Sequence, residues 1–216
     1  MGEDAVASPL GFVTLDLVLR VILPGALIFF LLGLVAPDLL RAVSSSVVTG
    51  LFAFLILGFL SYSFYRALYV AVVCRFVCPQ LNAARDAINE LTKAKKRWTL
   101  VRAIYIGWRE TQTADLRLKF VARVSPYVHA GYQSAIIFAL FAIYVLATSP
   151  SLPTVIMFGL VALLLFSASL REDHELALVE MDCMVGNWSD FYSYLIRTLT
   201  PELLGKAQVP SPPRAG

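Results

Sequence analysis

The chain has 216 residues, of which 58% are hydrophobic and only 15% are charged. A typical soluble domain is about half apolar and about one quarter charged. Because the apolar excess lies in long uninterrupted blocks, the composition excludes an ordinary soluble domain. It predicts an all-α integral membrane protein with four transmembrane helices.

Positive charge is concentrated in the middle of the chain, from Arg75 to Val124. This segment holds eleven of the 18 Lys and Arg residues and only four acidic residues, so its net charge is +7 in a chain whose total is +3. The positive-inside bias of membrane proteins accounts for such a block more simply than nucleic-acid binding does. We therefore expect no direct binding of nucleic acid.

Residues 1–11 are expected to form a short N-terminal tail. They contain no Lys or Arg, so the basic start of a cleavable signal peptide is missing, and the first apolar segment is expected to stay in the protein. That segment, residues 12–36, is the first predicted span, with a kink at Pro24. Asp16 and Arg20 are spaced for an ion pair on one helix face. If that pair holds the segment at the membrane surface, the threading changes.

The second predicted span begins at Val47 and stays uncharged for the 19 residues up to Tyr65. As a helix it measures about 28 Å, close to the hydrocarbon thickness of a bilayer. Arg66 therefore falls at the predicted inner boundary. Residues 12–78 are expected to hold spans 1 and 2, and Pro79 is expected to end the second helix.

Residues 79–126 are expected to form a basic helical cytoplasmic segment. A helix is predicted over residues 80–92 and a second over residues 99–124. Gly107 weakens the middle of the second helix, so two shorter helical pieces are the alternative. Between the two helices lies the candidate contact with a protein partner or with lipid headgroups: Lys93, Lys95, Lys96 and Arg97.

Residues 127–170 are predicted to hold spans 3 and 4. Pro126 is expected at the first turn of span 3, and residues 128–147 then carry no formal charge. A proline-containing turn at residues 149–153 leads to span 4, residues 154–170. This length is just sufficient to cross a bilayer.

Residues 171–207 are expected to form an acidic cytoplasmic helix, and residues 208–216 a disordered tail rich in Pro and Ser. From Arg171 onward there are seven acidic residues and four basic ones. The opposite charges favour docking on the basic segment, within a protomer or between protomers. Exposed ion pairs contribute only about 0–1 kcal/mol each. The apolar stripe that includes Leu176 and Met184 is therefore expected to do most of the holding.

The connections on the other side of the membrane are poor in Lys and Arg. By the positive-inside rule, the basic segment and both termini lie in the cytoplasm. The expected location is the cell membrane, as a multi-pass protein of the bacterial inner membrane.

Small residues recur at helix-packing spacing in two predicted spans. Such spacing lets helices approach closely in lipid, within a subunit or between subunits. Alanine is also simply common in membrane helices, which is the plainer interpretation. The candidate packing positions are Gly50 and Gly58 in span 2, and Gly131, Ala135 and Ala139 in span 3.

Four polar side chains are predicted to lie at one depth near the inner leaflet: Tyr62, Arg66, His129 and Gln133. Polar groups inside a membrane usually face protein or a water-filled cavity, so this inner-leaflet polar cluster is a candidate gate, ion pathway or ligand pocket. The simpler interpretation is that Arg66 and His129 merely lie at the headgroup boundary.

The sequence contains no phosphate-binding glycine loop, nucleophile elbow or paired-histidine metal motif. We expect no catalytic residues, no metal and no cofactor. Cys74 and Cys78 are four residues apart, but zinc would need further ligands, for which only His174 and Cys183 have the right type. The cysteines are expected to be thiols, with acylation near the membrane as an alternative.

These features favour a non-enzymatic, oligomeric membrane protein that acts as a sensor, anchor or scaffold for a cytoplasmic protein partner. Membrane lipid and further copies of the chain are the other expected partners. Small four-span components of prokaryotic defence and signalling systems have a similar layout, which is an analogy of layout only. The alternative is an oligomeric pore or ion channel gated through the cytoplasmic helices. A membrane enzyme is disfavoured because no catalytic set converges.

Overall fold

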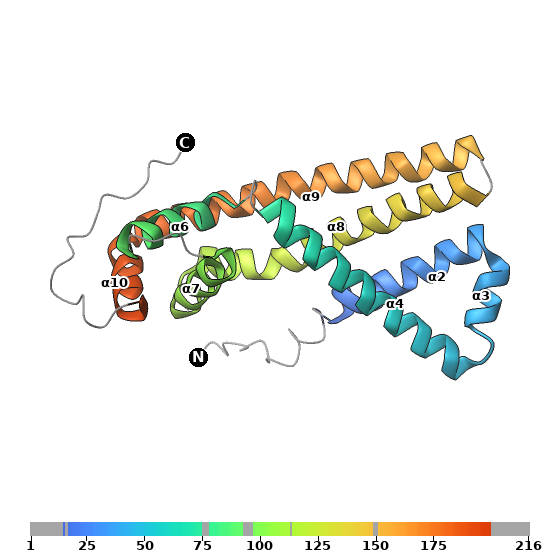
Figure 1. The fold of residues 1–216 in the computed structure, drawn as a ribbon, viewed down its shortest axis with the longest axis horizontal. Helices are drawn as coiled ribbons and strands as arrows, with labels where there is room; N and C mark the ends of the chain where they lie inside the picture. The colour runs from blue at the N-terminus through green and yellow to red at the C-terminus, as the bar shows by residue number, and fades with distance from the viewer. Residues whose placement is uncertain are drawn as a thin grey trace, which may run out of the picture. The chain divides into compact units, whose positions relative to one another are not determined.

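The computed structural model describes residues 15, 17–74, 78–92, 97–112, 114–148 and 151–199, and every regular element among them is helical (Figure 1). Four of these helices are long and apolar enough to cross a membrane: Val18–Val35, Val47–Val73, Leu116–Thr148 and Leu152–Gly186. The predicted all-α class with four candidate spans is therefore confirmed. The predicted tails at residues 1–11 and 208–216 lie outside the described residues.

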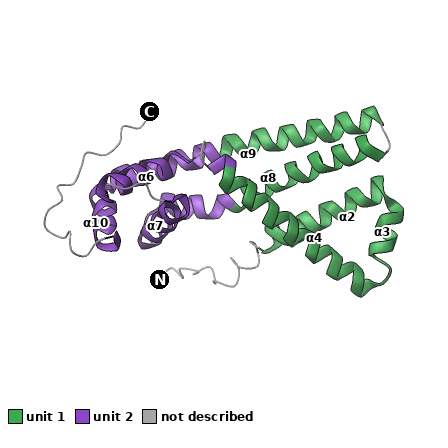
Figure 2. Cartoon of the chain, in the orientation of Figure 1, with its two compact units in different colours: residues 1–71, 126–172 green, residues 72–125, 173–216 purple. Residues whose placement is uncertain are grey.

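The chain divides into two compact units (Figure 2). Unit 1 comprises residues 1–71 and 126–172, and unit 2 comprises residues 72–125 and 173–216. Unit 1 contains the apolar part of every candidate span. Unit 2 contains most of the basic segment and most of the acidic one.

The first half of unit 1 is a helical pair joined by a short helix. Its elements are the π-helical turn η1 (Val18–Ile22), α2 (Leu23–Val35), α3 (Pro37–Val43), α4 (Val47–Leu68) and the π-helical turn η2 (Tyr69–Val73). Ser46 begins α4 with a capping box, because its side chain accepts from the Thr49 N–H while the Thr49 hydroxyl accepts from the Ser46 N–H. Pro24 lies in the first turn of α2, directly after η1, so its missing N–H cannot donate to a carbonyl of that preceding turn.

Two glycines let α4 approach the first helix closely. A Cβ atom on Gly25 would lie 2.6 Å from the backbone oxygen of Phe54, and one on Gly58 would collide with the backbone carbonyl of Val21. Backbone atoms cannot move aside as a flexible side chain can. The absence of side chains at these positions therefore permits the crossing.

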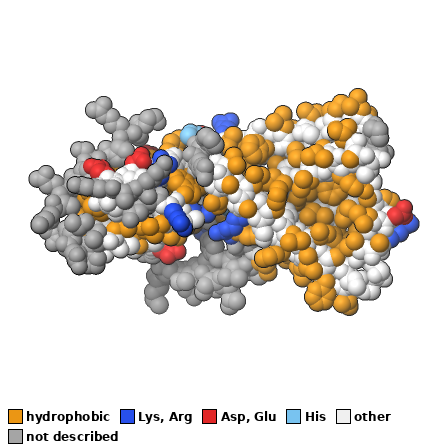
Figure 3. Space-filling view, in the orientation of Figure 1, with side chains coloured by type: hydrophobic (Ala, Val, Ile, Leu, Met, Phe, Trp, Pro, Cys, Tyr) orange, Lys and Arg blue, Asp and Glu red, His pale blue; other side chains and the backbone are white. Residues whose placement is uncertain are grey.

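The second half of unit 1 comes from α8 (Leu116–Thr148) and α9 (Leu152–Gly186). Leu31 of α2 packs with residues of these two helices in one apolar cluster, completed by Ile137, Ala142, Val145 and Phe158. The outer surface of unit 1 is also apolar, and hydrophobic side chains dominate it in Figure 3. An apolar core inside an apolar surface is the arrangement expected for helices immersed in lipid.

Unit 2 contains α6 (Pro79–Thr92), α7 (Trp98–Thr111) and α10 (Trp188–Leu199), together with residues 116–125 of α8 and 173–186 of α9. Its core is aromatic and fully buried. The rings of Trp108 and Phe191 meet edge to face at 5.1 Å, and Met184 and Leu195 are buried with them. Such ring pairs contribute about 0.5–1.5 kcal/mol beyond the area they bury.

Residues 99–124 belong to two helices, as the alternative prediction has it, but the predicted position of the break is wrong, because α7 ends at Thr111 and α8 begins at Leu116. The break does not fall at Gly107. That residue stays inside α7, where a Cβ atom would collide with the Tyr194 hydroxyl. Asp115 instead starts the next helix, since its carboxylate accepts from the Arg117 N–H at 2.8 Å, as an N-cap does.

Two further predicted boundaries are wrong for related reasons. Pro126 lies inside α8 and not in its first turn, because the helix has already begun ten residues earlier. Span 4 and the first part of the acidic segment form one helix, α9. The chain turns at Asn187, whose side-chain amide donates to the Cys183 carbonyl at 2.9 Å, and α10 follows.

Candidate functional site

The Tyr62 hydroxyl is the meeting point of two arginines in unit 1. Arg66, one turn further along α4, donates from Nη1 to this oxygen at 2.7 Å, and Arg20 of η1 donates to the same oxygen at 2.8 Å. The two guanidinium nitrogens are therefore about 5.5 Å apart at most. Each guanidinium carbon lies within 6.0 Å of the Tyr62 ring centroid, which is cation–π range.

Like charges at that distance repel each other. For unit charges about 5.5 Å apart, Coulomb's law gives about 3 kcal/mol at an effective dielectric constant of 20 and about a quarter of that in water. Arg66 is exposed, so its value lies toward the lower figure. A phenol oxygen can accept from both cations, but it carries no charge that would offset them.

His129 is connected to Tyr62 through Tyr65, whose ring centroid lies 6.4 Å from that of Tyr62. Its Nδ1 is hydrogen-bonded with the Tyr65 hydroxyl, and its ring meets the Tyr69 ring edge to face at 4.9 Å. The Tyr132 ring stacks on Tyr65 with 6.2 Å between centroids. The imidazole therefore sits among tyrosines.

Gln133 connects α8 to η1 and α4. Its side chain is only 1% exposed, and Nε2 donates at 3.2 Å to the backbone oxygen of Arg20 and at 3.2 Å to the Ser61 hydroxyl. Of the four residues predicted as one cluster, Tyr62 and Arg66 thus lie one turn apart on α4, and His129 and Gln133 lie one turn apart on α8. No hydrogen bond recorded among the described residues joins the two residues on α4 to the two on α8. The sequence prediction omitted Arg20, because that residue was assigned to a pair with Asp16, which lies outside the described residues.

The predicted packing residues occupy several different environments within one chain. Gly58 meets backbone, as described above, and a Cβ atom on Gly131 would collide with the Ser169 hydroxyl. A Cβ atom on Gly50 would lie 3.3 Å from Ser44, in the connection that precedes its own helix. The remaining two positions are on α8, where Ala135 is buried and Ala139 is half-buried.

The basic contact predicted between residues 92 and 98 is described only at one residue. Arg97 is exposed and directly precedes α7. Lys93, Lys95 and Lys96 lie outside the described residues. A cation–π contact between Arg85 and Trp98, at 5.7 Å, lies on the helices that flank this stretch.

A buried carboxylate in unit 2, on Glu180 of α9, joins three helices. It accepts from Gln80 Nε2 at 2.9 Å, from the Tyr105 hydroxyl at 3.0 Å and from Arg109 Nη1 at 2.6 Å. The Glu180 side chain is 8% exposed, whereas that of Arg109 is 31% exposed. Burial, followed by the adjacent carboxylate, raises the pKa of Tyr105 well above its ordinary value.

The position of Glu180 on an apolar stripe indicated a buried carboxylate, but the many other acidic residues of the segment obscured this signal. Glu180 lies four residues after Leu176 and four before Met184, on the apolar stripe that was predicted to face the basic segment. An acidic residue on a buried stripe requires a partner. The pairing of Glu180 with Arg109 places an acidic and a basic segment together within one chain.

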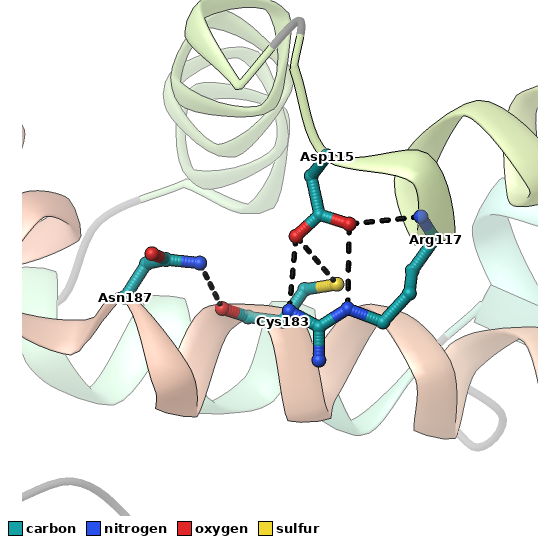
Figure 4. A network of polar contacts seen from close by, with 4 residues as sticks. All are labelled: Asp115, Arg117, Cys183 and Asn187. Carbon is teal, nitrogen blue, oxygen red and sulfur yellow. Dashed lines mark hydrogen bonds and ion pairs between the residues drawn. The ribbon is translucent and has the colours of Figure 1, made fainter.

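A second polar network in unit 2 surrounds Asp115 (Figure 4). Its carboxylate accepts from the Arg117 guanidinium at 3.0 Å and from the Cys183 thiol at 3.5 Å. The hydrogen bond from the Arg117 side chain is the main cause that lowers the pKa of Asp115 to about 2. The network links the start of α8 to the end of α9, where Asn187 also bonds.

The three cysteines are buried and form no disulfide. The sulfurs of Cys74 and Cys78 lie 3.3 Å apart, while Cys183 belongs to the Asp115 network. Among the residues that the structure describes, no three His, Cys, Asp or Glu side chains are grouped so that they could hold a metal ion.

No protein-family model, curated protein or solved structure matches the chain. Its function must therefore be inferred from the polar contacts of unit 1 and the core of unit 2.

Proposed function

We propose that the protein is a non-enzymatic, oligomeric membrane scaffold that binds a cytoplasmic protein partner through unit 2. The observation that carries this proposal is the internal core of unit 2. Its helices pack around Trp108 and Phe191 and are fixed by the Glu180 carboxylate. A segment between spans that has such a core presents a defined surface, as a binding module requires.

The chemistry of that surface favours an acidic partner. Arg97, Lys119 and Arg123 are exposed, and the side chain of Arg85 is 40% exposed. The whole segment from Arg75 to Val124 carries +7. Complementary charge speeds association and selects the partner, while buried apolar contacts supply most of the affinity.

The same charge distribution supports the proposed membrane orientation. Spans flanked by a basic segment on one side place that side in the cytoplasm, which puts unit 2 there together with both termini. The apolar surface of unit 1 would then face lipid or further copies of the chain.

A set of four substitutions tests the scaffold. Lys93, Lys95, Lys96 and Arg97 are changed together to Gln in the full-length protein, and cross-linked partners are identified by quantitative mass spectrometry in cells. The matched control changes the three lysines to Arg, which keeps the charge. The scaffold predicts a specific partner that is lost with the Gln variant and kept with the Arg variant. Equal recovery of the partner with both variants would show that this basic stretch does not bind it.

A pore built from several copies is the second candidate, and the exposure of Arg66 is the observation that favours it. A cation on the surface of an apolar span is costly unless it meets water, headgroups or another protein chain. Gln133 is enclosed within one chain, so Arg66 is the better placed of the two to line a lumen. In ion-release measurements on proteoliposomes, a pore predicts that Arg66→Ala alters the leak more than Gln133→Ala. No leak from the wild-type protein would exclude it.

A further inference from the structure

The Arg20, Tyr62 and Arg66 side chains converge in a way that the scaffold does not use. Both guanidinium groups donate to the Tyr62 hydroxyl, at 2.8 Å and 2.7 Å. Among the described residues no carboxylate pairs with Arg66. Two guanidinium groups that share a neutral acceptor, one of them exposed on Arg66, place positive charge at one end of the helical pair.

The donors at this point exceed its acceptors. The Arg66 guanidinium has five N–H donors, of which one is used on Tyr62, and Arg20 makes a further contact besides its bond to Tyr62. The Tyr62 hydroxyl accepts twice and still has its own proton to donate. An ion pair between Arg20 and Asp16, which lies outside the described residues, would still leave donors on Arg20. Phosphate suits such a set because its oxygens accept several charge-assisted hydrogen bonds at once.

We propose that Arg20, Tyr62 and Arg66 bind the phosphate of an anionic phospholipid headgroup. Two features favour a lipid over a soluble phosphate ester. Arg66 directly follows the uncharged run of α4 and Arg20 directly precedes that of α2, so both lie at the expected headgroup depth. Val18 and Phe59, exposed on the same two helices, supply apolar surface for the acyl chains.

The positions of the remaining polar groups are consistent with this site. Gln133 holds the backbone of Arg20 against Ser61, which fixes the turn that carries one of the two guanidinium groups. The Tyr62 ring, flanked by both cations, restricts them further. A site whose donors are already ordered loses less entropy when a headgroup binds.

The test measures lipid binding to the full-length protein in detergent micelles by native mass spectrometry. Phosphatidylglycerol is the anionic probe and phosphatidylcholine the zwitterionic one. Arg66→Gln removes one cation, and Tyr62→Phe removes the shared hydroxyl but keeps the ring. Arg41→Gln is the matched control, because it removes the same charge from an exposed arginine on α3, paired only with Asp38 among the described residues.

The site predicts that the wild-type protein binds phosphatidylglycerol more tightly than phosphatidylcholine. Arg66→Gln should weaken phosphatidylglycerol binding about tenfold, as expected for the loss of a hydrogen bond between charged groups, and Tyr62→Phe should weaken it several-fold. Arg41→Gln should leave it unchanged. Arg66→Lys, which keeps the charge but loses the planar fork, should recover part of the loss.

Three results would overturn the assignment. The first is equal binding of the two lipids by the wild-type protein. The second is an Arg66→Gln variant that binds phosphatidylglycerol as tightly as Arg41→Gln does. The third is displacement of the lipid by excess inorganic phosphate, which would indicate that the site binds a soluble phosphate ester instead of a lipid headgroup. Circular dichroism melting of each variant confirms that it is folded, and Arg66→Gln is expected to match the wild type because its side chain is exposed.

Discussion

Glu180→Ala is predicted to destabilise unit 2 by about 3 kcal/mol. The substitution removes the common acceptor of Gln80, Tyr105 and Arg109. Breaking a buried ion pair by removal of one partner costs about 3–5 kcal/mol. Arg109 is 31% exposed and can regain water, which lowers its share. The Tyr105 hydroxyl is buried and cannot, so it adds the cost of an unsatisfied polar group, about 1–3 kcal/mol.

Tryptophan fluorescence measures this effect in the intact protein. The chain has three tryptophans, Trp98, Trp108 and Trp188, and all of them belong to unit 2. Denaturant titration of the full-length protein in micelles therefore follows unit 2 without interference from the spans. Arg109→Ala, combined with Glu180→Ala in a double-mutant cycle, should reveal a coupling energy of about 1 kcal/mol or more.

Glu175→Ala is the matched control for this prediction. Glu175 lies on the same helix but is exposed, so its loss should change stability by no more than about 0.5 kcal/mol. If Glu180→Ala and Glu175→Ala unfold at the same denaturant concentration, the buried carboxylate does not hold the helices together, and the reasoning is refuted.

Three other predictions follow from the packing, the ionisation and the thiols. Gly58→Ala should lower the melting temperature of unit 1, because the added Cβ atom would meet backbone. Gly159→Ala should not lower it, since a Cβ atom there meets nothing within 4 Å. Equal melting temperatures of the two variants would contradict the close crossing of α4 and the first helix. Because the pKa of Asp115 is lowered, its ionised carboxylate stabilises the fold at pH values above its ordinary pKa of 3.8, and this stabilisation is lost as the pH falls toward about 2. Asp115→Asn should flatten the pH dependence of the fluorescence-detected stability between these two pH values. An unchanged slope would refute the assignment. The three buried cysteines should react with a maleimide much more slowly in micelles than after unfolding in dodecyl sulfate, and rapid native labelling would contradict their burial.

The sequence predicted the spans well because their signal is additive. Hydropathy accumulates over about 20 residues, so no single contact can reverse it. The start of α4 at Val47 was predicted from its uncharged apolar run and the helix ending at Thr92 from its apolar repeat, whereas the capping box at Ser46 was not predicted. Such features depend on residues a few positions apart.

The misplaced boundaries involve one local hydrogen bond and contacts between distant residues. Asp115 caps α8 with help from Arg117, and it also accepts from the thiol of Cys183, which is 68 residues away. With the helix started there, Pro126 becomes internal. Gly107 looked like a break, but it is a point of close approach by Tyr194.

The inner-leaflet polar residues were predicted from depth alone, which does not give their partners. Depth follows from residue counting along a span, whereas partners follow from the rotation of each helix about its axis. Sequence alone does not set that rotation, so the pairing of Arg20 with Tyr62 and of His129 with Tyr65 was not foreseen.

Membrane topology is the most direct test of the account, since the scaffold requires unit 2 and the outer connection to lie on opposite sides. Ser45→Cys places a thiol in the exposed connection before α4, and Thr99→Cys places one on the exposed face of α7. The native thiols are buried and should give little background. With a membrane-impermeant maleimide on intact bacterial cells, the account predicts labelling at position 45 immediately and at position 99 only after the membrane is opened. Labelling of position 99 on intact cells would place unit 2 outside and contradict a scaffold for a cytoplasmic partner.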